Sequence, residues 1–150
     1  MIDDDDGMAA RNRRPAGMSD ALVEALGVLS EALEAVERAR GRLYDFHQLT
    51  GGADLRLGEA AELLRAAGHD ADAERIETEL VGRNVLPGYW TFQMVEAYDD
   101  TYYQPFRELE QQVRADLAGG RRHIHEAEMK ESRRTHGHPD HSADPPRPAV

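Results

Sequence analysis

Four carboxylates at two places in the chain have a spacing that could hold a divalent cation. Glu74 and Glu77 are three residues apart, and so are Glu96 and Asp99. Residues three apart lie on one face of a helix, so each pair can direct two hard oxygen ligands at one ion. Magnesium-assisted phosphoryl chemistry uses such ligands. One hypothesis for the chain is therefore a magnesium site formed by these four residues.

The spacing of these carboxylates resembles the magnesium-binding pattern of the all-α nucleoside triphosphate pyrophosphohydrolases of the MazG type. That resemblance implies an enzyme in which carboxylates on two adjacent helices hold the metal ions and the phosphates. Composition supplies such pairs by itself, because 29 acidic residues among 150 predict about five or six pairs three residues apart and the chain has seven. No lysine or arginine pattern nearby would receive the phosphates. Magnesium-dependent hydrolysis is therefore kept as the alternative function.

Other catalytic patterns are missing from the sequence. It has no nucleophile motif, no phosphate-binding glycine loop and no zinc-protease signature. The absence of cysteine excludes disulfides and thiolate metal sites. Di-iron carboxylate bundles need Glu-x-x-His motifs, and no glutamate precedes a histidine by three residues. We expect no catalytic residue and no cofactor, with magnesium only in the alternative hypothesis.

Histidines are concentrated near the end of the chain, where five of the seven lie: His123, His125, His136, His138 and His141. Two of them have a glutamate three residues later, Glu126 and Glu128, and imidazole with carboxylate suits zinc or nickel. A metal site also needs groups that orient the rings, which a polar, proline-rich tail does not supply. Solvent-exposed histidines are the interpretation that we favour.

Aromatic residues are concentrated in one region. Seven of the nine fall within the eighteen positions 89–106, and the other two, Tyr44 and Phe46, lie beside His47. Aromatic side chains bury large areas and dominate contact surfaces. We expect one aromatic focus, with Trp90 at least half buried, where the end of one helix meets another. This focus is also the candidate binding site, made of Tyr44, Phe46, His47, Trp90, Phe92, Tyr98, Asp99 and Tyr102.

The elements that must position these residues read as helices. Six apolar residues recur with alternating four- and three-residue spacing, which is the seam of a helix that packs against another helix: Leu22, Leu26, Leu29, Leu33, Val36 and Leu43. Ser19 can cap the start of this helix. At Arg40 and His47 the seam position is occupied by a polar residue. We expect the helix to end at Thr50-Gly51-Gly52.

Helical periodicity continues along the chain without a strand signal. We expect short helices over about 55–67 and 72–81, a second long helix from about 90 to 118, and a final helix over 122–135. The expected inward residues of the second long helix are Phe92, Val95, Tyr102, Phe106, Leu109 and Val113. Pro105 either kinks this helix or opens a new one. The predicted fold class is all-α, a helical bundle of two long and two short helices with a C-terminal helical arm.

The second long helix has a polar seam residue of its own. Stepping along one face from Val95 to Phe106 places Asp99 on the buried side. If the two long helices are antiparallel, Asp99 faces Arg40. We predict an Arg40–Asp99 pair that fixes the register of the helices, because an isolated buried charge is costly. A ligand site lined by aromatic rings is the functional alternative.

Composition changes near both ends predict the domain boundaries. Residues 1–18 and 136–150 are polar and lack periodicity, so we expect a disordered leader and tail around a bundle domain (19–118) and an exposed helical arm (119–135). Residues 19–118 carry 20 acidic and 9 basic side chains. This acidic body repels phosphate backbones and disfavours nucleic acid as a partner. No stretch approaches the ~20 apolar residues of a membrane span, so we expect a cytoplasmic protein without a membrane partner.

Three stretches resemble small bacterial all-helical proteins of unassigned function. They are Gly82-Arg83-Asn84-Val85-Leu86-Pro87-Gly88-Tyr89-Trp90-Thr91-Phe92-Gln93, Tyr98-Asp99-Asp100-Thr101-Tyr102 and Glu126-Ala127-Glu128-Met129-Lys130. The resemblance spans roughly residues 19–135 and implies a bacterial helical protein, with no activity attached. The long seam and the acidic body favour a protein that acts by self-association, as a homo-oligomer, or by binding another protein through helix packing.

Overall fold

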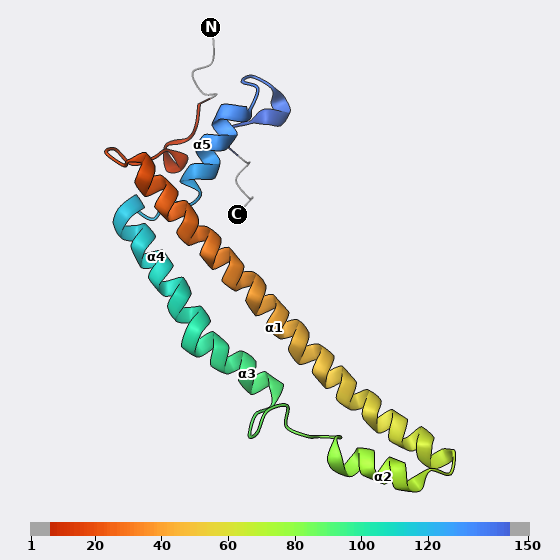
Figure 1. Ribbon diagram of the computed structural model, residues 1–150. Coiled ribbons are helices and arrows are strands. Elements are labelled where there is room, and N and C mark those ends of the chain that lie inside the picture. Colours follow the sequence, from red (N-terminus) through yellow and green to blue (C-terminus); the bar gives the residue numbers. More distant parts are fainter. Residues whose placement is uncertain (1–6, 145–150) are drawn as a thin grey trace, which may run out of the picture. The chain divides into compact units, whose positions relative to one another are not determined.

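The computed structural model describes residues 7–144, and in this range the protein is all-α, as predicted. Its α-helices are α1 (Asp20–Ala66), α2 (Asp70–Glu79), α3 (Thr91–Tyr98), α4 (Gln104–Ala118) and α5 (Ile124–Arg133) (Figure 1). A π-helix, η2 (Asp99–Tyr103), joins α3 to α4, and two 3-10 helices, η1 (Ala10–Asn12) and η3 (Pro139–His141), lie towards the ends. The disorder predicted for residues 1–6 and 145–150 falls outside the described residues.

The first helix is longer than predicted. α1 continues through Gly51 and Gly52, where we expected it to end, and includes the separate short helix expected over 55–67. The seam explains this, since it keeps its four–three spacing after Val36 through residues that are all at least partly buried: Arg40, Leu43, His47, Thr50, Asp54, Leu57, Ala61 and Leu64. Packing along the seam outweighs the roughly 1 kcal/mol by which each glycine disfavours a helix. Two long and two short helices are therefore only an approximate description.

The second long helix is continuous but changes type, because η2 lies between α3 and α4. Three of its expected inward residues are exposed: Phe92, Tyr102 and Leu109. Tyr103 and Glu110 are buried instead. A π-helix closes i→i+5 bonds and so takes up more residues per turn. A prediction that uses α-helical spacing across η2 therefore selects Tyr102 and Leu109, each one residue before the residue that is buried. Pro105 lies in the first turn of α4, where proline is tolerated.

The described residues form two compact units, and each unit includes part of α1. Unit 1 contains the residues up to Leu33 and those from Arg107 onward, and unit 2 contains Glu34–Phe106. Unit 1 has an apolar cluster of four buried residues, Met18, Val23, Ala118 and Ile124, with Leu22 and Leu26 packed against it. Residues on both sides of positions 18 and 118 thus share one small core. The boundaries at 18, 118 and 135 stay a prediction, which limited proteolysis would test.

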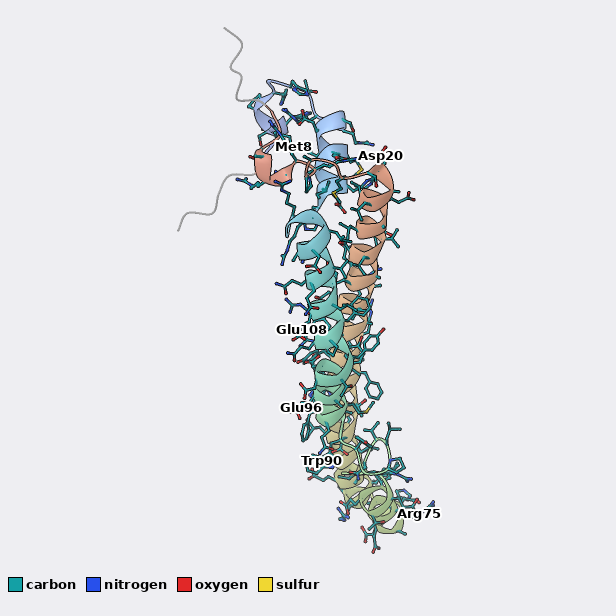
Figure 2. All side chains as sticks on the ribbon, turned by 90° about the vertical axis from the view of Figure 1, so that its left-hand side faces the viewer. Met8, Asp20, Arg75, Trp90, Glu96 and Glu108 are labelled. Carbon is teal, nitrogen blue, oxygen red and sulfur yellow. The ribbon has the colours of Figure 1, made fainter. Side chains whose placement is uncertain are left out.

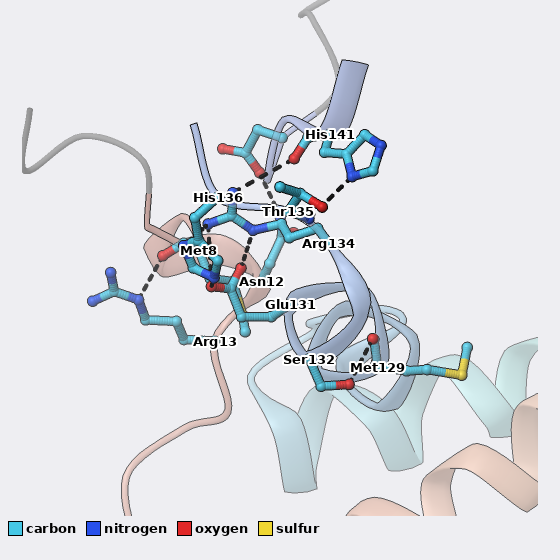
Figure 3. Close-up of polar contacts among 11 residues, drawn as sticks. Met8, Asn12, Arg13, Met129, Glu131, Ser132, Arg134, Thr135, His136 and His141 are labelled. Atoms are coloured by element: carbon cyan, nitrogen blue, oxygen red, sulfur yellow. Dashed lines mark hydrogen bonds and ion pairs between the residues drawn. The ribbon is translucent and has the colours of Figure 1, made fainter. Parts of the chain in front are cut away.

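Arg134 organises the end of unit 1. Its side chain is fully buried, and its Nε donates a 2.6 Å hydrogen bond to Glu131 (Figure 3). Its Nη1 donates to the backbone carbonyl of His141 at 3.5 Å, while Nδ1 of His141 accepts from the Thr135 N–H at 3.0 Å. The disorder that we expected of the segment from residue 136 stays a prediction. A buried guanidinium needs partners for its five donors, and this segment supplies some of them.

Unit 2 is an antiparallel helical hairpin with a short third helix. Arg40 contacts Asp99 and the later His47 contacts the earlier Thr91, so α1 runs opposite to α3 and η2. α2 turns back beside the end of α1, where Arg65 donates two hydrogen bonds to Glu77. Among residues 7–144, no helix is both long enough and apolar enough to cross a membrane.

Candidate functional site

The seam of α1 changes character between the two units. In unit 1 it is built from leucine, whereas in unit 2 it includes three hydrophilic residues that each have a defined partner. Arg40 pairs with Asp99, Nδ1 of His47 lies 2.7 Å from Oγ1 of Thr91, and Oδ1 of Asp54 accepts a 2.7 Å hydrogen bond from the Gly82 N–H. Polar seam residues of this kind specify register. They attach α3, η2 and the segment after α2 to particular positions on α1.

Arg40 is the centre of the largest of these contacts. Its Nε and Nη2 donate to the two carboxylate oxygens of Asp99 at 2.7 and 3.0 Å. Its guanidinium carbon lies 5.1 Å from the ring centroid of Tyr44 and 4.7 Å from that of Tyr103. The Tyr103 hydroxyl donates to the carboxylate of Glu37 at 2.7 Å. The structure thus brings Arg40 and Asp99 together in a fork-to-fork pair that also uses two aromatic rings.

The charges of this cluster hold each other in place. The hydrogen bonds from Arg40, aided by its positive charge, lower the pKa of Asp99, although partial burial opposes the shift. The same hydrogen bonds raise the pKa of Arg40. Asp99 therefore stays ionised to a lower pH, and Arg40 stays charged to a higher pH, than either side chain would without the other. A guanidinium that is hydrogen-bonded to both oxygens of one carboxylate and that contacts two aromatic rings is suited to positioning α1 against η2.

The predicted aromatic focus is divided into separate groups. Tyr44 belongs to the Arg40 cluster. Along η2 and its neighbours, Tyr102 lies between Tyr98 and Phe106, with ring centroids 5.5 and 5.9 Å away. Phe46 is 40% exposed on α1. The expected single focus at a helix end is therefore wrong, because Tyr98, Tyr102 and Phe106 follow one another at four-residue spacing and contact along their own helix.

Trp90 forms the third aromatic group, with Phe92. Their ring centroids are 5.3 Å apart in an edge-to-face arrangement. Trp90 is 57% exposed, so the prediction that it is at least half buried is wrong. Trp90 has an extended backbone and precedes the first residue of α3, whereas we expected the second long helix to begin at about residue 90 (Figure 2). Its N–H donates to Oε1 of Gln93 at 3.1 Å, which anchors its backbone at the helix start.

The four carboxylates of the magnesium hypothesis do not form one group. Glu74 and Glu77 lie in α2, Glu96 in α3 and Asp99 in η2. Glu77 is engaged by Arg65, whose hydrogen bonds lower its pKa, and Asp99 is engaged by Arg40. Within residues 7–144, no three or more histidine, aspartate or glutamate side chains are placed so that they could hold a metal ion.

The C-terminal histidines contact protein groups in the described part of unit 1. Nδ1 of His123 lies 3.9 Å from Glu126, and the rings of His138 and His141 have centroids 4.5 Å apart. His136 contacts both Glu131 and Arg134 (Figure 3). His123, His125, His136 and His138 are solvent-exposed, as we expected, whereas His141 is partly buried.

Three residues at the contacts of unit 2 were not among the predicted site residues. Tyr103 and Glu37 belong to the Arg40 cluster, and Thr91 contacts His47. Tyr103 lies four residues after Asp99, so it could have been found by taking the wider step along the seam. Glu37 follows the seam residue Val36 directly. Thr91 has no sequence signal of its own, because its contact depends on where α3 begins.

The Arg40 cluster, the Trp90–Phe92 ring contact and the polar contacts of the seam are all features of helix packing and of the protein surface. Nothing in this geometry specifies one reaction. No family model matches the chain, and neither a curated protein nor a solved structure matches it significantly.

Proposed function

We propose that the protein acts by association, with another copy of itself or with a protein partner, through helix packing. The observation that supports this most directly is the outer side of α1 in unit 2. Leu49, Leu55 and Leu63 lie outside the seam there and are 73%, 78% and 65% exposed. A single exposed leucine is ordinary on a protein surface. Three on one helix, added to the other exposed apolar residues of unit 2, provide a surface that a further helix would cover.

Unit 2 also buries little of its own apolar surface. Among the described residues, five of its apolar side chains are buried: Val36, Ala61, Ala73, Val95 and Tyr103. Twelve of its large apolar side chains are exposed: Tyr44, Phe46, Leu49, Leu55, Leu63, Leu80, Val85, Leu86, Tyr89, Trp90, Phe92 and Tyr102. Helices in water depend mainly on tertiary packing for their stability. Association would supply packing that the hairpin alone does not have.

The charge of α1 permits close approach of a second copy. Residues 34–66 carry six acidic and five basic side chains, which nearly cancel. Like-charged surfaces repel, and this part of the acidic protein is close to neutral. The outer leucines therefore lie on the stretch of unit 2 where self-association meets little electrostatic opposition.

Sedimentation equilibrium tests the proposal. The wild type should sediment above the monomer mass, and a triple variant with Leu49→Gln, Leu55→Gln and Leu63→Gln should shift to monomer. Glutamine has nearly the helix propensity of leucine, so circular dichroism of the variant should keep the helical signal. A matched variant, Leu109→Gln, changes an exposed leucine of unit 1 and should leave the mass unchanged.

The alternative function is tested on the same samples. Magnesium-dependent release of pyrophosphate from a nucleoside triphosphate, lost in Glu77→Gln without loss of helical signal, would favour hydrolysis. A monomeric wild type that shows this activity would overturn the proposal. An oligomer without turnover is the expected result.

A further inference from the structure

The segment between α2 and α3 forms a tight turn that presents apolar residues. The Tyr89 N–H donates to the Leu86 carbonyl at 2.9 Å, and the two residues between them are Pro87 and Gly88. Gly88 has φ +80°, a conformation that favours glycine, and proline presets the preceding position. The turn is therefore stiff before any partner arrives.

Four large apolar side chains around this turn are exposed, and we call them the aromatic turn: Leu86 (48%), Tyr89 (51%), Trp90 (57%) and Phe92 (41%). Trp90 is held from two sides, because its ring contacts Phe92 and its backbone N–H contacts Gln93. Tryptophan and tyrosine dominate the energetic centres of protein interfaces, since they bring large area at low cost in conformational entropy. A rigid group of such residues has the chemistry of a docking site.

The aromatic turn lies in a strongly acidic stretch of the chain. Residues 70–100 carry eight acidic and two basic side chains. Arg75 is paired with Glu79, which leaves Arg83 as the other cation. Glu77, Glu79 and Asp99 are each paired with an arginine. The other five carboxylates of this stretch make no hydrogen bond or ion pair through their side chains with any described residue: Asp70, Asp72, Glu74, Glu96 and Asp100. A fixed apolar group thus lies within a strongly acidic stretch of the chain.

This combination of charge and shape selects one kind of partner. A second copy would bring the same negative charge to the same place, and nucleic acids and anionic membranes are repelled in the same way. A protein segment with apolar residues flanked by lysine or arginine complements both features.

We propose that the aromatic turn docks a cationic amphipathic segment of another protein. The inference rests on the proposed function, namely that the protein acts by association, and it names the partner chemistry at this surface. The apolar side chains of the partner pack on Leu86, Tyr89, Trp90 and Phe92. Its cations approach the unpaired carboxylates of α2, α3 and η2.

The chain supplies its own reporter for this test, because Trp90 is its single tryptophan. Two synthetic helices of about five turns serve as probes, one of leucine and lysine and one of leucine and glutamate with the same spacing. The leucine–lysine peptide should shift Trp90 emission to shorter wavelength with saturation, and its affinity should fall as salt is raised from about 0.05 to 0.5 M. The leucine–glutamate peptide should leave the emission unchanged.

Variants separate docking from general attraction to an acidic protein. Fluorescence anisotropy of the labelled leucine–lysine peptide should show about a tenfold or greater loss of affinity for Trp90→Ala and for Tyr89→Ala, since interface aromatic residues contribute at this level. Leu109→Ala, an exposed apolar residue of unit 1, should bind as the wild type does. Equal losses in all three variants, or none, would overturn the inference. So would insertion of Trp90 into neutral phosphatidylcholine vesicles without saturable peptide binding.

The same titration on the triple glutamine variant distinguishes the two proposals. If that variant is monomeric and still binds the leucine–lysine peptide, both proposals hold and use different surfaces. A wild type that is monomeric but binds the peptide contradicts self-association alone. An oligomeric wild type that fails to bind the peptide contradicts the docking inference alone.

Discussion

The two units of the protein use similar helices in opposite ways. Unit 1 gathers its buried apolar residues into one cluster, and only four of its large apolar side chains in the described range are exposed: Val28, Leu109, Leu117 and Met129. Unit 2 exposes twelve such side chains and relies on polar contacts from α1 to α3, η2 and the preceding loop. Both units contain enough apolar residues for a core. They differ in how many large apolar side chains they leave exposed, and five of the twelve in unit 2 lie between α2 and α3.

Packing usually does two things together: it stabilises the fold and it fixes the register of the helices. Burial of apolar surface supplies most of the free energy of folding, whereas a hydrogen bond contributes only about 0.5–1.5 kcal/mol net. Unit 1 therefore concentrates its buried apolar residues in one cluster, whereas the five of unit 2 are spread over α1, α2, α3 and η2. Unit 2 fixes its register with Arg40, His47 and Asp54 and leaves apolar surface for contacts outside itself.

The largest expected effect is in the core of unit 1. Ile124→Ala should lower the free energy of unfolding by about 2–5 kcal/mol, because it removes a buried aliphatic side chain from a small cluster. Leu109→Ala in the same unit is the matched control and should change the free energy by less than about 0.5 kcal/mol. Urea denaturation followed by circular dichroism measures both. If both variants lowered the free energy of unfolding equally, unit 1 would not depend on its apolar cluster, and the contrast with unit 2 would be lost.

A second test breaks the register contact of unit 2. Asp99→Ala should cost about 1–3 kcal/mol, since it leaves a partly buried guanidinium without its carboxylate. Asp100→Ala changes the neighbouring carboxylate, which is exposed and makes no ion pair with a described residue, and should be close to neutral. If both variants unfold at the same urea concentration as the wild type, Arg40 and Asp99 do not stabilise the hairpin.

Acid should weaken the same contact. Arg40 lowers the pKa of Asp99, so the stabilisation is present above the unfolded-state pKa of about 3.9 and is lost as the pH falls through the lower folded-state value. Glu77 and Glu128 shift in the same direction beside Arg65 and Arg14, so the wild type should lose stability below about pH 4 from several pairs. The loss should be smaller in Asp99→Ala than in Asp100→Ala. Thermal melts over the acidic range would show the difference.

The smallest effects come from the glycines of α1. A methyl group at Gly51 or Gly52 would meet no atom within 4 Å, and both residues are helical. Each substitution by alanine should therefore stabilise the protein by about 0.5–1 kcal/mol. Gly88→Ala is the contrasting variant, because φ +80° strains any other residue, and it should lower the melting temperature. A destabilising Gly51→Ala would show that α1 does not continue through this position.

Periodicity was sufficient to predict the helical class, the seam of α1 and the facing of Arg40 and Asp99. Each of these depends on a repeat that many residues share. The prediction that α1 ends at Gly51-Gly52 is wrong, because the seam continues after these glycines and its packing outweighs their low helix propensity. Tyr102 and Leu109 were each placed one position early, since nothing in the sequence marks a π-helix, whereas Phe106 and Val113 are partly buried as expected. Trp90 was misplaced because its exposure depends on the residue at which α3 begins.

The glycines of α1 are unevenly distributed, with Gly41, Gly51, Gly52 and Gly58 in the unit 2 part and Gly27 alone in the unit 1 part. Glycine-rich helix with little covering surface opens locally at low free energy. Backbone amides of residues 41–58 should therefore exchange with deuterated solvent earlier than those of residues 20–33. A partner that covers the outer leucines would slow that exchange. Binding would then be coupled to ordering of the helix, and the entropy lost on ordering would lower the affinity.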